Sequence, residues 1–174
     1  MKLSNFVKLA LPSAVLALGL ISTPASATNS STTLMSVNAS VAAFCTISAG
    51  PLAFGAISNP TAAITTSTTI SYKCNTGTTV AGITFTTSAF SPPATTFGMA
   101  GATNGGTLAY SLNLSSTGAI PVTSGTEILS SSTLTFTANG TQQSLPVYGQ
   151  ITQAAAAAAA ADSYTDSVTV TFTY

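Results

Sequence analysis

Charged side chains are almost absent from this chain, at 3% of 174 residues, and neither histidine nor arginine occurs. A soluble domain usually carries about 25% charged residues. Without a basic patch the chain cannot displace counterions from phosphates, which excludes nucleic-acid binding. A surface of Ser, Thr, Asn and Gln also has little electrostatic protection against association. The composition is therefore typical of a molecule that assembles.

The absence of histidine excludes the Ser-His-Asp and Cys-His arrangements of nucleophilic enzymes. The only carboxylates are Glu127, Asp162 and Asp166. A glycosidase needs two carboxylates flanking a cleft, whereas Asp162 and Asp166 lie on either side of the start of the last predicted strand, where charges cap turns or stay solvated. Calcium needs about 6–8 oxygen ligands, more than these side chains supply. We predict a protein without catalytic residues, cofactor or metal.

The first 27 residues have the features of a secretory signal peptide. Lys2 and Lys8 give a positive start, residues 9–21 are largely apolar, and residues 25–27 read Ala-Ser-Ala, as signal peptidase requires. A membrane anchor is the alternative, but the apolar run is shorter than the roughly 20 residues that span a bilayer. We expect the mature chain to begin at Thr28 and to form one domain.

Cys45 and Cys74 are the only cysteines. In an exported chain an even number of cysteines indicates a disulfide, and closing a loop of about thirty residues would stabilise the fold by roughly 3–4 kcal/mol. A metal pair or a catalytic thiol would need a histidine that the chain lacks. A Cys45–Cys74 disulfide is the prediction.

The composition of the mature chain is typical of strands and turns. It is rich in Thr, Val, Ile, Phe and Tyr, and these residues are interrupted by Gly, Pro, Ser and Asn. Seven or so short strands with turn signals between them predict an all-β, immunoglobulin-like β-sandwich. The predicted strands after the first are residues 52–57, 64–74, 80–87, 107–115, 128–137, 143–152 and 163–174. Residues 88–106 are predicted as a long connection that can hold a short edge strand, and the alanine run at 154–161 as a loop with one helical turn.

The first predicted strand, residues 35–47, is longer than the usual 5–6 residues or so. Its odd positions are all apolar, among them Met35, Val37, Ala39 and Val41, and a period of two marks a strand with one buried face. The residues alone leave two interpretations open. Either the whole stretch is the first strand of its own domain, or its first half enters a neighbouring molecule.

Four segments in order resemble the spore coat protein U domain family, which includes the pilins of archaic (Csu-type) chaperone–usher pili. They are Val-Asn-Ala-Ser-Val-Ala-Ala-Phe-Cys-Thr-Ile at 37–47, Pro-Leu-Ala-Phe-Gly at 51–55, Val-Tyr-Gly-Gln-Ile at 147–151, and Ser-Tyr-Thr-Asp-Ser-Val-Thr-Val-Thr-Phe-Thr-Tyr at 163–174. In the centre the family's usual Arg and Trp-Gly or Tyr-x-Leu-Tyr element is not matched; the chain has Tyr-Ser-Leu-Asn at 110–113.

The resemblance implies an incomplete immunoglobulin fold that lacks its last strand. A periplasmic chaperone would lend a strand, and at an outer-membrane usher the N-terminal segment of an identical or homologous pilin would replace it. Residues 28–43 would be the donor segment and residues 44–174 the pilin domain. The implied donor side chains are Met35, Val37, Ala39 and Val41, and the implied groove or chaperone edge is Val168, Val170, Phe172 and Tyr174, with the terminal carboxylate as the chaperone's first contact.

The expected function is a structural subunit of a secreted surface pilus that supports adhesion and biofilm formation, with no nucleic-acid partner. A spore-coat-type secreted structural protein is the alternative. An outer-membrane β-barrel fits less well, because the chain has an internal disulfide, an uncharged would-be lumen and no aromatic girdles. An adhesive tip would need a second, receptor-facing domain, for which the chain has no room.

Overall fold

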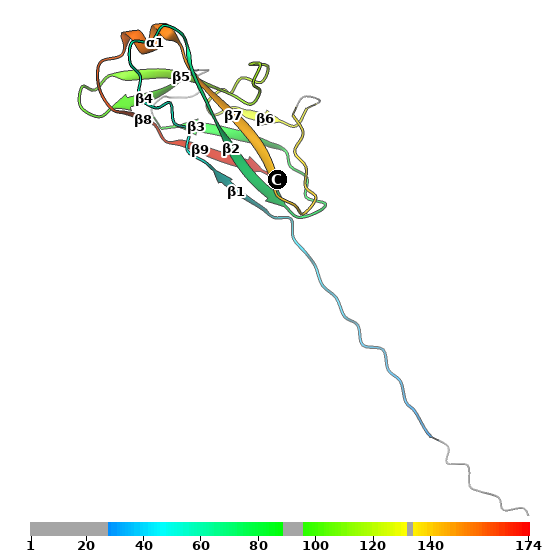
Figure 1. Ribbon diagram of the computed structural model, residues 1–174. Coiled ribbons are helices and arrows are strands. Elements are labelled where there is room, and N and C mark those ends of the chain that lie inside the picture. The colour runs from blue at the N-terminus through cyan, green and yellow to red at the C-terminus, as the bar shows by residue number, and fades with distance from the viewer. Residues whose placement is uncertain (1–27, 89–95, 132–133) are drawn as a thin grey trace, which may run out of the picture. The chain divides into compact units, whose positions relative to one another are not determined.

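The fold is described from a computed structural model, which describes residues 28–88, 96–131 and 134–174 (Figure 1). The chain divides into two units, Met1–Ala39 and Ser40–Tyr174. The predicted signal peptide, residues 1–27, lies outside the described residues. All the strands belong to the second unit.

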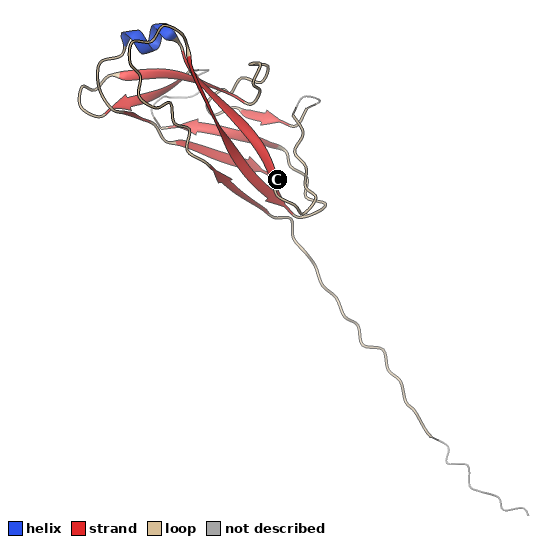
Figure 2. Ribbon diagram, in the orientation of Figure 1, coloured by secondary structure: helices blue, strands red, loops and turns tan. Residues whose placement is uncertain are grey.

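Two antiparallel sheets make up the Ser40–Tyr174 unit (Figure 2). The larger has the order β1 (Cys45–Ala49), β2 (Ile64–Cys74), β7 (Gln143–Ile151), β5 (Thr107–Asn113), β4 (Phe97–Gly101), β8 (Tyr164–Thr165). The smaller has the order β6 (Glu127–Leu129), β3 (Gly82–Thr87), β9 (Val168–Thr173). Every strand pair in the two sheets is antiparallel. The predicted all-β, immunoglobulin-like sandwich is confirmed.

The core lies between the two sheets and follows the alternation of the sequence. In β2 the side chains of Ile70, Tyr72 and Cys74 are buried, and β3 contributes Ile83 and Phe85 from the opposite sheet. The alternating leucines and tyrosine of β5 are buried as well. Because strand side chains alternate between two faces, this pattern fixes which face of each strand meets the core.

Three aromatic rings close the end of the core near the disulfide. Tyr72 and Phe172 have ring centroids 4.7 Å apart, and Phe136 lies 5.1 Å from Phe172 and 6.2 Å from Tyr72. Such offset and edge-on pairs add roughly 0.5–1.5 kcal/mol beyond the area they bury. The β9 side chain Phe172 is thereby fixed against β2 across the sandwich.

Several predicted strands differ from the observed elements. Residues 52–57 have no strand assignment, although Leu52, Phe54 and Ile57 are partly buried against the core. The predicted last strand, residues 163–174, is divided into β8 and β9, which join different sheets. The reason is local, because the Asp166 carboxylate accepts the Ser167 N–H at 2.7 Å and takes that backbone donor out of the ladder.

The predicted strand at 128–137 is only the three-residue β6, and the predicted edge strand within residues 88–106 is β4. The alanine run contains the helix α1 (Gln153–Ala158), as the predicted helical turn anticipated. Thr152 caps it by accepting the Ala155 N–H at 3.1 Å, and Ala156 is buried. Among the described residues, no helix has the length and apolar character needed to cross a membrane.

Candidate functional site

Two edge strands, β1 of the larger sheet and β9 of the smaller sheet, lie near each other, and each has one unpaired side. Among the described residues, β1 is an outer strand of the larger sheet and pairs only with β2, and β9 is an outer strand of the smaller sheet and pairs only with β3. β1 and β9 approach each other in space, as Figure 1 shows. Unpaired strand edges are templates for pairing with another chain.

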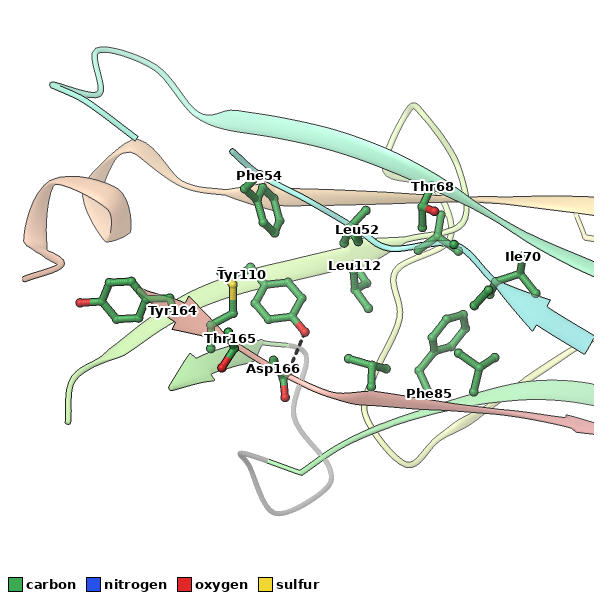
Figure 3. A pocket seen from close by; sticks show the side chains of 16 residues that line it. Leu52, Phe54, Thr68, Ile70, Phe85, Tyr110, Leu112, Tyr164, Thr165 and Asp166 are labelled. Atoms are coloured by element: carbon green, nitrogen blue, oxygen red, sulfur yellow. Dashed lines mark hydrogen bonds between the residues drawn. The ribbon is translucent and has the colours of Figure 1, made fainter. Parts of the chain in front are cut away.

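A groove of about 330 Å³ opens between the segment that follows β1 and the region of β8 and β9 (Figure 3). One wall is the segment after β1, with Leu52 and Phe54, and the other is the β8–β9 region, with Tyr164, Val168 and Val170. The floor is formed by core side chains, namely Ile70, Phe85, Tyr110, Leu112 and Val147. The groove therefore has an apolar floor and lies beside the unpaired side of β9. An apolar floor next to an unpaired strand edge is a geometry that can receive an additional strand.

Several apolar side chains along the groove and beside it are incompletely covered. Val168 and Val170 are half-buried, Ile47 on β1 is 39% exposed, and Tyr174 after β9 is 53% exposed. Of the predicted edge residues, Val168 and Val170 line the groove, Phe172 is buried in the core, and Tyr174 is exposed beyond the last strand. A strand laid into the groove would remove apolar surface from water at about 25 cal/mol per Å².

A polar cluster around Asp166 lies at one end of the groove. The carboxylate accepts the Tyr110 hydroxyl at 2.6 Å (Figure 3). It also accepts the Thr87 hydroxyl, at 2.8 and 2.9 Å. These bonds tie β3 and β5, which belong to different sheets, to the point where the chain crosses from β8 to β9. The sequence interpretation of Asp166 as a turn cap or solvated charge is therefore incomplete, since this carboxylate joins the sheets. Asp162 does fit it, accepting the N–H groups of Thr103 and Asn104.

The Asp166 cluster predicts a loss of stability at alkaline pH. Burial, then the hydrogen bond to Asp166 and its negative charge, raise the pKa of Tyr110 above its ordinary value of 10.0. Above about pH 10 the unfolded chain releases the Tyr110 proton while the folded chain retains it, so the free energy of unfolding falls as pH rises. Below that pH the contribution is fully present. Urea titrations at several values between about pH 8 and pH 11 measure this slope.

The matched variant for that measurement is Tyr110→Phe, which keeps the ring and removes the proton. At neutral pH it should lose roughly 1.5–3 kcal/mol, because a hydrogen bond to a charged group is removed. Its stability should also fall less steeply above about pH 10 than that of the wild type. Equal slopes in the two proteins would contradict the assignment.

Gly149 in β7 lies under the groove wall. A Cβ atom at this position would come within 2.7 Å of the Leu52 side chain and 2.9 Å of the Phe54 ring. The glycine thus lets the segment at 52–54 rest directly on β7, and Gly55 ends that contact with a φ of 73°, a backbone conformation that favours glycine. This contact therefore joins two of the sequence motifs, Val-Tyr-Gly-Gln-Ile and Pro-Leu-Ala-Phe-Gly.

The segment at residues 28–43 has no regular secondary structure, and every side chain in it is exposed. The exposed fraction is 83% for Met35, 79% for Val37 and 81% for Val41, and Leu34 is fully exposed. The other predicted donor residue, Ala39, is exposed too. The interpretation of residues 35–47 as one long strand of the chain's own domain is wrong, because β1 begins at Cys45. We call residues 28–43 the N-terminal arm.

Comparison with family models matches residues 31–171 to the Spore Coat Protein U domain. The chain belongs to this family. The match includes most of the arm and nearly all of the Ser40–Tyr174 unit. The resemblance carried by the four sequence segments is thereby confirmed.

A comparison with curated proteins found no match. Among solved structures, one similar chain comes from a structure described as a chaperone-tip adhesin complex that is vital for synergistic activation of CFA/I fimbriae biogenesis. That chain is 14% identical with a TM-score of 0.42, and the match covers 71% of this chain and 40% of that one. This chain thus corresponds to less than half of that protein's length.

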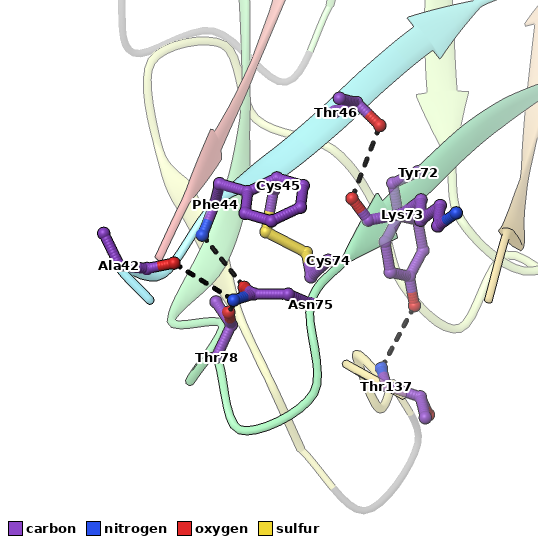
Figure 4. Close-up of a disulfide and its surroundings, with 10 residues drawn as sticks. All are labelled: Ala42, Phe44, Cys45, Thr46, Tyr72, Lys73, Cys74, Asn75, Thr78 and Thr137. Atoms are coloured by element: carbon purple, nitrogen blue, oxygen red, sulfur yellow. Dashed lines mark hydrogen bonds between the residues drawn. A yellow bond between two sulfur atoms is a disulfide. The ribbon is translucent and has the colours of Figure 1, made fainter. Parts of the chain in front are cut away.

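The predicted disulfide is present and lies where the arm joins β1 (Figure 4). Cys45 and Cys74 are directly opposite in the β1–β2 ladder and are bonded, with their Cα atoms 4.1 Å apart. Cys74 is fully buried and Cys45 is partly buried. Within the family fold the bond fixes the first residue of β1 to the last residue of β2.

Sequence reasoning missed two residues, Asn75 beside the disulfide and Tyr110 in the groove. The Asn75 side chain accepts the Phe44 N–H at 3.0 Å and donates to the Ala42 carbonyl at 3.0 Å, also shown in Figure 4. The one available signal for Asn75 is its place directly after Cys74, at the end of the predicted strand 64–74. Tyr110 lies in the predicted strand 107–115, and nothing in the sequence pairs it with Asp166.

Proposed function

We propose that this member of the family is a structural subunit of a secreted surface fibre of the chaperone–usher kind, assembled by donor-strand complementation. The observation that carries the proposal is the groove between the segment that follows β1 and the unpaired side of β9, in a chain that also has an exposed arm of alternating apolar residues. The groove lacks a strand, and the arm has the pattern of one.

The arm and the groove match in length and chemistry. From Met35 to Val41 the arm has seven residues, against six in β9. In an extended strand Met35, Val37, Ala39 and Val41 point to one side. Burying the three larger side chains in a neighbour's groove is worth roughly 1.5–3 kcal/mol each, and backbone pairing with the groove edges adds to this.

An uncovered groove explains why such a subunit needs partners before assembly. Exposed apolar side chains and unpaired strand edges favour aggregation, and a chaperone strand in the groove would prevent it. In this proposal residues 1–27 direct export to the periplasm, a chaperone covers the groove edge at Val168, Val170, Phe172 and Tyr174, and an outer-membrane usher exchanges the chaperone for the next subunit's arm. The fibre then supports adhesion and biofilm formation at the cell surface.

Electron microscopy of cells that express this chain with its periplasmic chaperone and usher tests the proposal. We expect thin surface fibres that bind gold-labelled antibodies raised against residues 44–174. Cells without the usher should retain the chain in the periplasm and carry no fibres. Gold label on an amorphous layer, with or without the usher, would contradict the fibre and favour the alternative of a coat-type secreted protein.

A further inference from the structure

The arm joins its own domain at the point where the β1–β2 backbone ladder ends. β2 ends at Cys74, and the chain turns away through Thr76 and Gly77, whose φ is 87°. Residues 42–44 therefore have no further strand residues of β2 beside them. Without another partner they would be a free hinge between the arm and the first disulfide-bonded residue, Cys45.

Asn75 supplies that missing partner with its side chain. Its backbone N–H donates to the Phe44 carbonyl at 3.2 Å, and its side-chain oxygen accepts the Phe44 N–H at 3.0 Å. Its side-chain NH₂ donates to the Ala42 carbonyl at 3.0 Å. An asparagine amide presents the same donor and acceptor as a peptide group, so the side chain extends the ladder past the end of β2.

The Asn75 amide is itself held in place. The Thr78 hydroxyl donates to its oxygen, and the Thr78 N–H donates to the Asn75 carbonyl at 3.2 Å. Thr78 is buried, with 9% of its surface exposed. Thr78 thus bonds both the side-chain oxygen and the backbone carbonyl of Asn75. The orientation of the Asn75 amide is therefore set by the turn at 75–78 rather than by the arm.

We propose that Asn75 is the positioning residue that ends the donated strand at Val41 and joins it stiffly to the domain behind it. The inference rests on the proposed function. The polar backbone groups of Phe44 and the Ala42 carbonyl are engaged within the chain's own domain. Within the part of the chain that the structure describes, the arm up to Val41 has only the Asn38–Ser36 side-chain hydrogen bond. Successive subunits are then connected without a flexible linker.

Asn75→Ala tests the proposal in assembled fibres. The disulfide, the arm and the backbone bond from the residue-75 N–H to the Phe44 carbonyl are kept in this variant, so fibres should still form. The side-chain bonds to the Phe44 N–H and the Ala42 carbonyl are lost, so residues 42 and 43 become a flexible linker between subunits. We expect the fibre's persistence length, measured from electron micrographs, to fall by about twofold or more, as a short flexible linker at every joint predicts. Asn75→Asp keeps the acceptor for the Phe44 N–H and loses the donor to Ala42, so its fibres should be intermediate.

Thr76→Ala is the matched control, because Thr76 lies in the same turn with an exposed side chain. Its fibres should be as stiff as those of the wild type. Hydrogen exchange of the Phe44 amide in the monomer gives a second readout, and it should be faster in Asn75→Ala and unchanged in Thr76→Ala.

Wild-type stiffness in the fibres of Asn75→Ala and Asn75→Asp overturns this inference and leaves the proposed function intact. A wild-type chain that forms no fibres with its chaperone and usher overturns the proposed function instead. If Asn75→Ala does not fold, the Asn75→Asp fibres decide the question by the same comparison.

Discussion

Deletion of residues 28–41 abolishes fibre formation and leaves a folded subunit that still binds its chaperone. The groove, the disulfide and the Asn75 contacts all lie outside the deleted residues, so the truncated chain keeps an open groove. It loses the segment that would fill the groove of its neighbour. We expect a periplasmic chaperone complex of normal yield and no surface fibres by electron microscopy.

Point substitutions separate the apolar face of the arm from its length. Replacing Met35, Val37 and Val41 by Ser removes roughly 1.5–3 kcal/mol of burial at each position and should abolish fibres as the deletion does. Replacing Ser36 and Asn38 by Ala changes the other face of the same segment and should leave fibres intact. Fibres assembled from the deletion variant would show that the arm is not the donated strand.

Removal of the disulfide by Cys45→Ser with Cys74→Ser should lower the free energy of unfolding by about 3–4 kcal/mol, since a long loop is released in the unfolded chain. The two cysteines are separated by 29 residues in the sequence. A typical domain has only about 5–15 kcal/mol in total, so the loss is a large share of its stability. Urea unfolding of the chaperone-free subunit measures it.

The double substitution avoids the free thiol that a single change would leave, and oxidised wild type in the same buffer is the reference. The denaturant slope should change little if the native fold is kept. A loss well under about 1 kcal/mol would contradict the role given to this bond, because it would mean that β1 is held to β2 by the ladder alone.

The alternation in β2 and β5 was readable from the sequence because these strands have one face in the core. Ile70, Tyr72 and Cys74 in β2 show it directly, and the family motifs agree with it. At residues 35–43 the same rule left two interpretations open. The pattern of a half-buried strand is present there, but in the single chain its apolar side chains are exposed. Periodicity indicates that a segment can form a strand with one buried face, but it does not indicate which molecule buries that face.

The groove itself could not be derived from the sequence, since its walls come from segments far apart in the chain. Leu52 and Phe54 face Val168 and Val170 only because β1 and β9 end up as neighbouring edges of different sheets. The Asp166 side chain decides where the chain changes sheets, and its partners Tyr110 and Thr87 are 56 and 79 residues away. Contacts over such distances leave no local pattern.

The most direct test of the account is hydrogen exchange in the subunit that lacks residues 28–41, with and without a synthetic peptide of residues 28–43. The peptide should protect backbone amides on the unpaired sides of β1 and β9 and raise the melting temperature, because it supplies the strand that the groove lacks. A peptide with Val37 and Val41 replaced by Ser should do neither. Unchanged exchange at β1 and β9 in the presence of the native peptide would contradict donor-strand complementation by this arm.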